Sequence, residues 1–202
     1  MSKIPAAGAA GKNPDELATD EDLLDRMRHD DVHAYRELVS RHIGRGYAVA
    51  LRILKNAADA EDATQDAFVK AWLGRRDWEP GRAKFSTWLY RVVVNRCIDM
   101  VRAPKSEGLD ETTEPVDESA DAVDGIQRQQ IYGRLGDALD RLPPQQKAAV
   151  VLSYYEELSN QDVADVMGTS VSAVESLLKR ARKGLREFLR HSEQDVRGAL
   201  FE

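Results

Sequence analysis

The chain has 202 residues, of which 42% are hydrophobic and 32% charged, and its formal net charge is −6. It has no apolar run of the ~18 residues that cross a bilayer, and its first twenty residues lack the apolar core of a secretory signal. A single cysteine excludes an internal disulfide and suits a reducing compartment. We therefore expect a cytoplasmic protein without membrane insertion. The net charge alone argues weakly against nucleic-acid binding, because Lys and Arg attract phosphate.

Apolar residues recur at helical spacing along most of the chain, and no strand-like alternation stands out. The sequence therefore predicts an all-α fold. Residues 1–19, rich in Ala, Gly and Pro, predict a disordered N-terminal tail. A helical pattern begins at Asp20, and the long amphipathic helix that follows is predicted to end at Asn56.

The next helix is predicted to begin at Asp59, with Asp62 at the capping-box position. Its carboxylates are spaced three and four residues apart, away from its apolar stripe. Three interpretations stay open: a solvated helix start favoured by the helix dipole, a divalent-metal site, and a docking face for a basic partner. No His or Cys joins the cluster, which weakens the metal interpretation. The candidate residues are Asp59, Asp62, Gln65 and Asp66.

A loop over residues 74–84, marked by Gly and Pro, leads into a basic helix over residues 87–102. One face of that helix is apolar. The other face carries a tryptophan among Arg and Asn, an arrangement suited to stacking on an unpaired base and holding phosphates. The alternative is a tryptophan packed on a neighbouring helix and arginines that only solubilise. The candidates in the loop and helix are Arg75, Arg76, Arg82, Lys84, Phe85, Trp88, Arg91, Asn95 and Arg102.

Residues 104–125 differ in composition, because they lack aromatic residues and are dominated by Asp and Glu. They predict a flexible acidic linker between a first domain, residues 20–103, and a second domain, residues 126–190. The linker holds much of the negative charge, so the net charge does not describe the folded domains. Residues 191–202 give little signal and are predicted as a C-terminal tail.

The second domain is predicted to be a helix-turn-helix, with a turn at Gly168 before a last helix over residues 171–190. The exposed face of that helix begins with small polar residues and continues with cations. This order is typical of a helix that meets base edges in the major groove and phosphates beyond them. The alternative is an ordinary helical hairpin with a solvated basic face. The candidates are Ser172, Ala173, Glu175, Ser176, Lys179, Arg180, Arg182 and Lys183.

Three blocks of the sequence together resemble the extracytoplasmic-function (ECF) group of bacterial sigma factors, over about residues 20–190. DAEDATQDAFVKAW resembles the family's main core-polymerase-binding helix. FSTWLYRVVVNRCIDMVR resembles its promoter-melting, −10-reading helix, and residues 139–186 resemble its −35-reading domain. The blocks occur in the family's order.

The resemblance implies a role for each block and names the partners. Asp62, Gln65 and Asp66 would dock on the coiled coil of the polymerase's largest subunit, with the polymerase flap as a further contact. The loop that ends at Ser86 would form a pocket for a base flipped out of the −10 strand. The last helix would read duplex −35 DNA, and an anti-sigma factor would hold the protein inactive. The family often carries Lys or Arg where Glu175 stands, so the −35 sequence is not predicted.

Two other functions remain as alternatives. One is a stand-alone helix-turn-helix regulator with a sensory or dimerising first domain, and the other is a metal-dependent phosphohydrolase built on the three aspartates. The preferred prediction is a monomeric binding protein, not an enzyme, with no cofactor and no metal. His29 and His33 have metal-binding spacing but are expected to be solvated. Cys97 is expected to pack in the interior.

Overall fold

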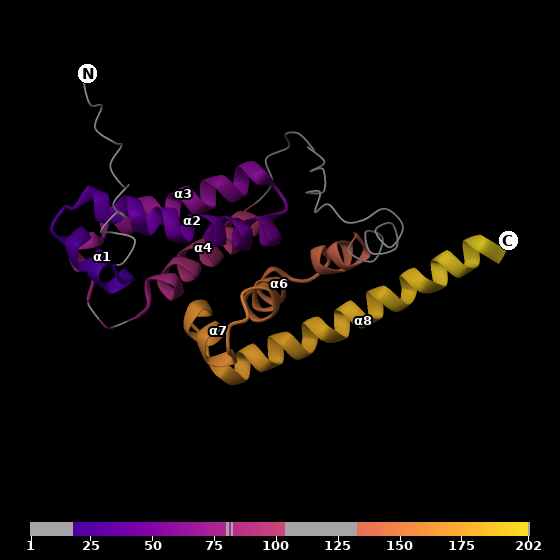
Figure 1. Cartoon of the computed structure of the whole chain (residues 1–202). Coiled ribbons are helices and arrows are strands. Elements are labelled where there is room, and N and C mark those ends of the chain that lie inside the picture. The colour runs from indigo at the N-terminus through magenta and orange to yellow at the C-terminus, as the bar shows by residue number, and fades with distance from the viewer. Residues whose placement is uncertain (1–17, 80, 82, 104–132, 202) are drawn as a thin grey trace, which may run out of the picture.

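The computed structural model describes residues 18–79, 81, 83–103 and 133–201 (Figure 1). Every regular element within these residues is a helix, which confirms the all-α prediction. The helices form one group before residue 104 and a second group after residue 132. The predicted linker and nearly all of the predicted N-terminal tail lie outside the described residues.

The first domain consists of four α-helices and a short 3-10 turn. Thr19 begins the first helix with a capping box, in which its side chain and that of Asp22 each bond the other's backbone N–H. The three longest helices pack on one another around a core that includes Leu38, Phe68 and Leu89. The elements are α1 (Asp20–Arg28), α2 (Val32–Leu54), α3 (Ala57–Leu73), η2 (Arg75–Asp77) and α4 (Phe85–Arg102).

The predicted start of α3 is wrong by two residues. Lys55 ends α2 in the left-handed conformation, with φ at 58°. Asn56 is then extended, and its side chain accepts the backbone N–H of Asp59 at 2.9 Å. Asn is among the best N-cap residues, so the helix begins directly after it, and Asp62 lies one turn further in than the capping-box position.

The second domain begins with a helical segment over residues 133–140 and ends in the long helix α8 (Val171–Phe201). Between them lie α6 (Pro144–Val150), the π-helical turn η3 (Val151–Tyr155) and α7 (Asn160–Met167). Gly168 ends α7 with φ at 64°, a conformation that glycine adopts without strain. The predicted sharp turn before the last helix is therefore confirmed.

Helix α8 extends beyond its predicted end near residue 190 and continues to Phe201. Residues 191–202 are predicted as a tail because they give little signal in the sequence. They contain no proline, however, and most of them are tolerant or good helix formers. The helix therefore ends later than the sequence predicts.

The two domains touch each other, with α7 packed against α4 (Figure 1). The hydroxyl of Tyr90 donates a hydrogen bond across this interface to a carboxylate oxygen of Glu156 at 2.7 Å. Arg52 lies 3.9 Å from the same carboxylate and places its guanidinium over the ring of Tyr155. The basic helix α4 is therefore shared between the core of the first domain and the interface with the second.

Among the described residues, none of the helices combines the length and the apolarity that crossing a membrane requires.

Candidate nucleic-acid interface

A cluster of aromatic rings lies at the N-terminal end of α4. The ring of Trp88 stacks on Phe85 at a centroid distance of 5.9 Å and meets Trp78 edge-on at 5.6 Å. Trp88 is half-buried in this cluster. The tryptophan packs on its neighbours, as the alternative interpretation of the sequence has it, but it is not fully enclosed by them. Such a ring is held in place before any base arrives.

The assignment of Phe85 as a DNA-contacting residue needs correction. Its side chain is only 2% exposed and lies among the rings of Phe68, Trp78 and Trp88. The α-helical face that it occupies points into the core, so the ring does not reach a nucleic acid in this conformation. Its ring packs against that of Trp88 and supports it.

Four other candidates of the basic stripe lie at the surface of α4 or directly before it. Lys84, Arg91, Asn95 and Arg102 are exposed, and Ser86 is half-buried. Arg91 also lies close to the turn of the second domain, since a Cβ added at Gly168 would stand 3.4 Å from its Nη2 atom. The second domain therefore stands directly beside the stripe that the sequence assigns to single-stranded DNA.

Two of the loop arginines are engaged within the protein. Arg75 and Arg76 each donate a hydrogen bond of 2.7 Å to the carboxylate of Asp30. These bonds, first that from Arg76 and then that from Arg75, hold the pKa of the Asp30 carboxyl below its usual value. The guanidinium of Arg75 also covers the ring of Trp72 at 4.1 Å. Arg82 lies outside the described residues.

Sequence reasoning missed Asp30, although one local signal marks it. It stands in the short turn between α1 and α2 with φ at 66°, a conformation in which Asp is enriched. The arginines that it binds lie 45 and 46 residues away in sequence, so the sequence around Asp30 does not predict the contact.

The predicted −35 face of α8 is exposed as the amphipathic pattern requires. Val174, Leu178 and Ala181 are buried against the rest of the second domain, on the side opposite the candidates. The hydroxyl of Ser170 accepts the backbone N–H of Ala173 at 3.2 Å near the start of the helix. Ala173 is half-buried. The exposed candidates are Ser172, Glu175, Ser176, Lys179, Arg180, Arg182 and Lys183.

The acidic candidates on α3 are spread along the helix. Asp62 and Gln65 are exposed, whereas Asp59 is half-buried. Asp66 forms an ion pair of 3.0 Å with Arg96 of α4. Within the described part of the chain, no three His, Cys, Asp or Glu side chains are grouped as a metal site would need.

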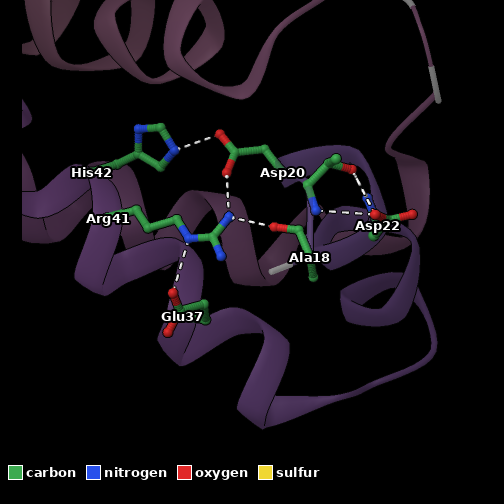
Figure 2. A network of polar contacts seen from close by, with 7 residues as sticks. Ala18, Asp20, Asp22, Glu37, Arg41 and His42 are labelled. Carbon is green, nitrogen blue, oxygen red and sulfur yellow. Dashed lines mark hydrogen bonds and ion pairs between the residues drawn. The ribbon is translucent and has the colours of Figure 1, made fainter. Parts of the chain in front are cut away.

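A polar network joins α1 to α2 (Figure 2). Arg41 donates to Glu37 at 2.9 Å and to Asp20 at 3.2 Å. The other oxygen of Asp20 lies 2.6 Å from Nε2 of His42, and the ring of His42 meets Phe85 edge-on at 5.1 Å. This network, which sequence reasoning also missed, connects the start of α1 to Phe85, and Phe85 in turn packs against Trp88.

Cys97 is fully buried in α4. Burial raises the pKa of its thiol to about 12, so the reactive thiolate is disfavoured. The position agrees with the predicted packing role.

The fold and these surfaces together define a class of protein: a two-domain helical DNA-binding protein with a helix-turn-helix in its second domain. Comparison with known families gives the same result in more detail. The model of Sigma-70 region 2 matches residues 38–107, and that of Sigma-70, region 4, matches residues 132–185.

Curated relatives identify the group within that class. The chain is 35% identical over 173 residues to the ECF RNA polymerase sigma factor SigE of Mycolicibacterium smegmatis, a match that covers 82% of this chain and 66% of that one. It is 31% identical over 185 residues to the ECF RNA polymerase sigma factor SigM of Mycobacterium tuberculosis, a match that covers 92% of this chain and 90% of that one. The chain therefore belongs to the ECF RNA polymerase sigma factors.

Solved structures agree with this assignment. CnrH, determined in complex with the cytosolic domain of CnrY, superposes with a TM-score of 0.64 at 28% identity, covering 85% of this chain and 97% of that chain. The sigma factor RpoE of Bartonella quintana, in complex with the anti-sigma factor NepR, shares the fold with a TM-score of 0.58 at 21% identity, covering 79% and 98%. Membership of this family makes the chain a specificity factor for transcription initiation and favours that prediction over the stand-alone regulator.

Proposed function

We propose that this chain directs core RNA polymerase to promoters by reading the −35 element with α8 and capturing the −10 strand with α4. The observation that carries the proposal is the face of α8: small polar residues and then cations are exposed, while the apolar stripe is buried. The first turns of such a helix enter the major groove, and its later cations reach phosphates.

The acidic face of α3 is the proposed docking site for core polymerase. Asp62 and Gln65 are exposed there, and Asp66 lies beside them in an ion pair with Arg96. Cations on the coiled coil of the polymerase's largest subunit would complement this charge, steer the encounter and set its register. The polymerase flap is the proposed contact of the second domain.

Trp88 is the proposed stacking platform for an unpaired −10 base, and the exposed Arg91 and Asn95 lie further along the same helix. Stacking on an aromatic ring contributes ~1–3 kcal/mol per base. Binding that favours the open strand shifts the duplex toward the melted state. The energy comes from binding alone, so this chain needs no nucleotide hydrolysis for this step.

Regulation by an anti-sigma factor is part of the proposal. One structural relative is named in complex with an anti-sigma factor, and the two domains of this chain already face each other through α4 and α7. A partner that binds both domains and keeps them together would hold Arg91 beside the helix-turn-helix and away from DNA.

Binding to purified core polymerase tests the docking part. Wild type and the Asp62→Ala/Asp66→Ala variant are compared by gel filtration and native gel, with the anti-sigma factor removed. Saturable binding that weakens in the variant supports the proposal. Wild-type protein that stays separate from core contradicts it.

A further inference from the structure

Asp30, in the short turn between α1 and α2, binds both arginines of the 3-10 turn η2. Its Oδ1 atom accepts the Nε–H of Arg75 at 2.7 Å, and its Oδ2 atom accepts an Nη2–H of Arg76 at 2.7 Å. The Nη2 atom of Arg75 is paired with Oδ1 as well. A single carboxylate therefore joins two turns of the first domain that are far apart in sequence.

The turn that carries Asp30 is fixed by its own hydrogen bonds. The backbone N–H of Asp30 donates to the carbonyl of Met27 at 3.0 Å, and the side chain of Met27 is fully buried. The next residue, Asp31, caps α2 by accepting the backbone N–H groups of His33 and Ala34. The carboxylate of Asp30 therefore attaches η2 to a fixed point of the domain.

Arg75 extends this contact to the end of α3. Its Nη1 atom donates to the backbone carbonyl of Trp72 at 2.8 Å, and its guanidinium lies 4.1 Å from the centre of the Trp72 ring. The side chain of Arg75 is only 17% exposed. Ion pairs in water usually contribute little, but a guanidinium held by a carboxylate, a carbonyl and an aromatic face in a largely enclosed site has a defined place.

The position of η2 determines where Trp78 lies. Trp78 follows η2 directly, and its backbone N–H donates to the carbonyl of Arg75 at 3.4 Å. Its ring meets Trp88 edge-on at 5.6 Å and lies 5.9 Å from that of Phe85. A continuous series of contacts thus connects the turn between α1 and α2 with the ring proposed as the stacking platform.

We infer that Asp30 is a positioning residue for capture of the −10 strand, because it fixes η2 and, through Trp78, the orientation of Trp88. The inference rests on the function proposed above and deepens it. A ring that is already held in its binding orientation loses less conformational freedom when a base stacks on it. Arg75 then acts through Asp30 and not as a ligand of the strand, whereas the side chain of Arg76 is 70% exposed and accessible to a phosphate.

The test uses a variant that removes the carboxylate without straining the turn. Asp30 has φ at 66°, and glycine adopts this conformation freely, so Asp30→Gly is the informative change. Asp25→Ala is the matched control, since Asp25 is an exposed aspartate of α1 that pairs with Arg28 at 3.5 Å. Each protein is assembled with core polymerase and titrated with a labelled single-stranded oligonucleotide that carries a −10 sequence mapped by run-off transcription. Binding to core and to −35 duplex is measured in parallel.

We expect Asp30→Gly to bind the −10 strand roughly three- to tenfold more weakly than wild type, with binding to core and to −35 duplex unchanged. Charge alone predicts the opposite, because removal of a carboxylate beside two arginines favours phosphate binding. Asp25→Ala should bind like wild type.

Circular dichroism provides a readout that a general loss of stability would not reproduce. The three tryptophans of the chain, Trp72, Trp78 and Trp88, all belong to this series of contacts. Asp30→Gly should therefore change the near-UV spectrum while the far-UV spectrum, which reports helix content, stays the same.

A further variant separates positioning from direct binding by Arg75. If Arg75 acts only through Asp30, Arg75→Met should cause no additional loss of strand binding in the Asp30→Gly background. An additional loss would show that Arg75 contacts the strand itself and would overturn this part of the inference.

Three other results contradict the inference or its basis. Strand binding that is unchanged or stronger in Asp30→Gly contradicts it, and stronger binding would mean that Asp30 competes with a phosphate. Weaker binding without a change in the near-UV spectrum also contradicts it, because the rings would then not have moved. A wild-type holoenzyme that captures no −10 strand would instead refute the function proposed above, a failure that is distinct because it appears without any substitution.

Discussion

Trp88 and Phe85 are neighbours in one aromatic cluster, but we expect Trp88 to contact DNA and Phe85 to stabilise the fold. The ring of Phe85 is 2% exposed and supports the half-buried Trp88 from below. Trp88→Ala should weaken capture of single-stranded −10 DNA by the holoenzyme, and because Trp88 is only half-buried it should lower the free energy of unfolding less than Phe85→Ala does. Phe85→Ala leaves a cavity and should cost ~3–5 kcal/mol of stability, with strand capture lost as a consequence. Urea unfolding and oligonucleotide binding, measured on both variants, separate the two roles. Equal losses of stability would contradict the assignment.

At the scale of elements, polar and charged side chains follow one another along the exposed face of α8, and we expect them to make different contacts with −35 DNA. In the proposed function Lys179 contacts phosphates, so Lys179→Ala should weaken −35 binding about equally for all sequences and lower the salt slope by about one. Glu175 lies one turn earlier, among the positions that we propose to read bases. Glu175→Gln should instead alter which base pairs are preferred, since an acid there favours a cytosine amino group. Selection from a randomised −35 library gives both results, and an unchanged preference in Glu175→Gln would place that residue away from the bases.

Helix periodicity and local propensity account for what the sequence could predict at this scale. The stripe of Val174, Leu178 and Ala181 predicted both the buried face of α8 and its exposed candidates. The start of α3 was missed because Asn56 and Asp59 are both good caps, and only the left-handed Lys55 decides between them. The partner of Arg75 and Arg76 was missed because Asp30 is distant in sequence, and no local pattern encodes a contact between two turns.

At the scale of the whole molecule, the contact between the domains is incompatible with the proposed reading of both promoter elements at once. From −35 to −10 is about 25 base pairs, or about 85 Å of duplex at 3.4 Å per pair. Arg91 of α4 lies beside Gly168 of the second domain. The proposed function therefore requires the domains to separate before α4 and α8 occupy the two elements.

The hydrogen bond between Tyr90 and Glu156 is the contact whose loss should ease that separation. Tyr90 is 4% exposed, and burial, followed by the bond to Glu156, raises the pKa of its hydroxyl. Glu156→Ala removes the group that accepts the proton of this buried hydroxyl, at a cost of ~1–3 kcal/mol to the closed form. Small-angle scattering should then show a larger radius of gyration. Tyr90→Phe should have a similar effect, and the double variant should add little to either single one. Unchanged scattering in all three would show that apolar packing alone holds the domains.

Transcription with a purified core polymerase tests the central claim most directly. Core alone, core with wild type, and core with the Lys179→Ala/Arg180→Ala variant are each given fragmented DNA from the source genome, and run-off products are mapped. We predict discrete start sites that require the wild-type chain, share one −35 and one −10 element, and weaken in the variant. Tight binding of this chain to specific duplex sites without core, together with no start site that depends on it, would contradict the account.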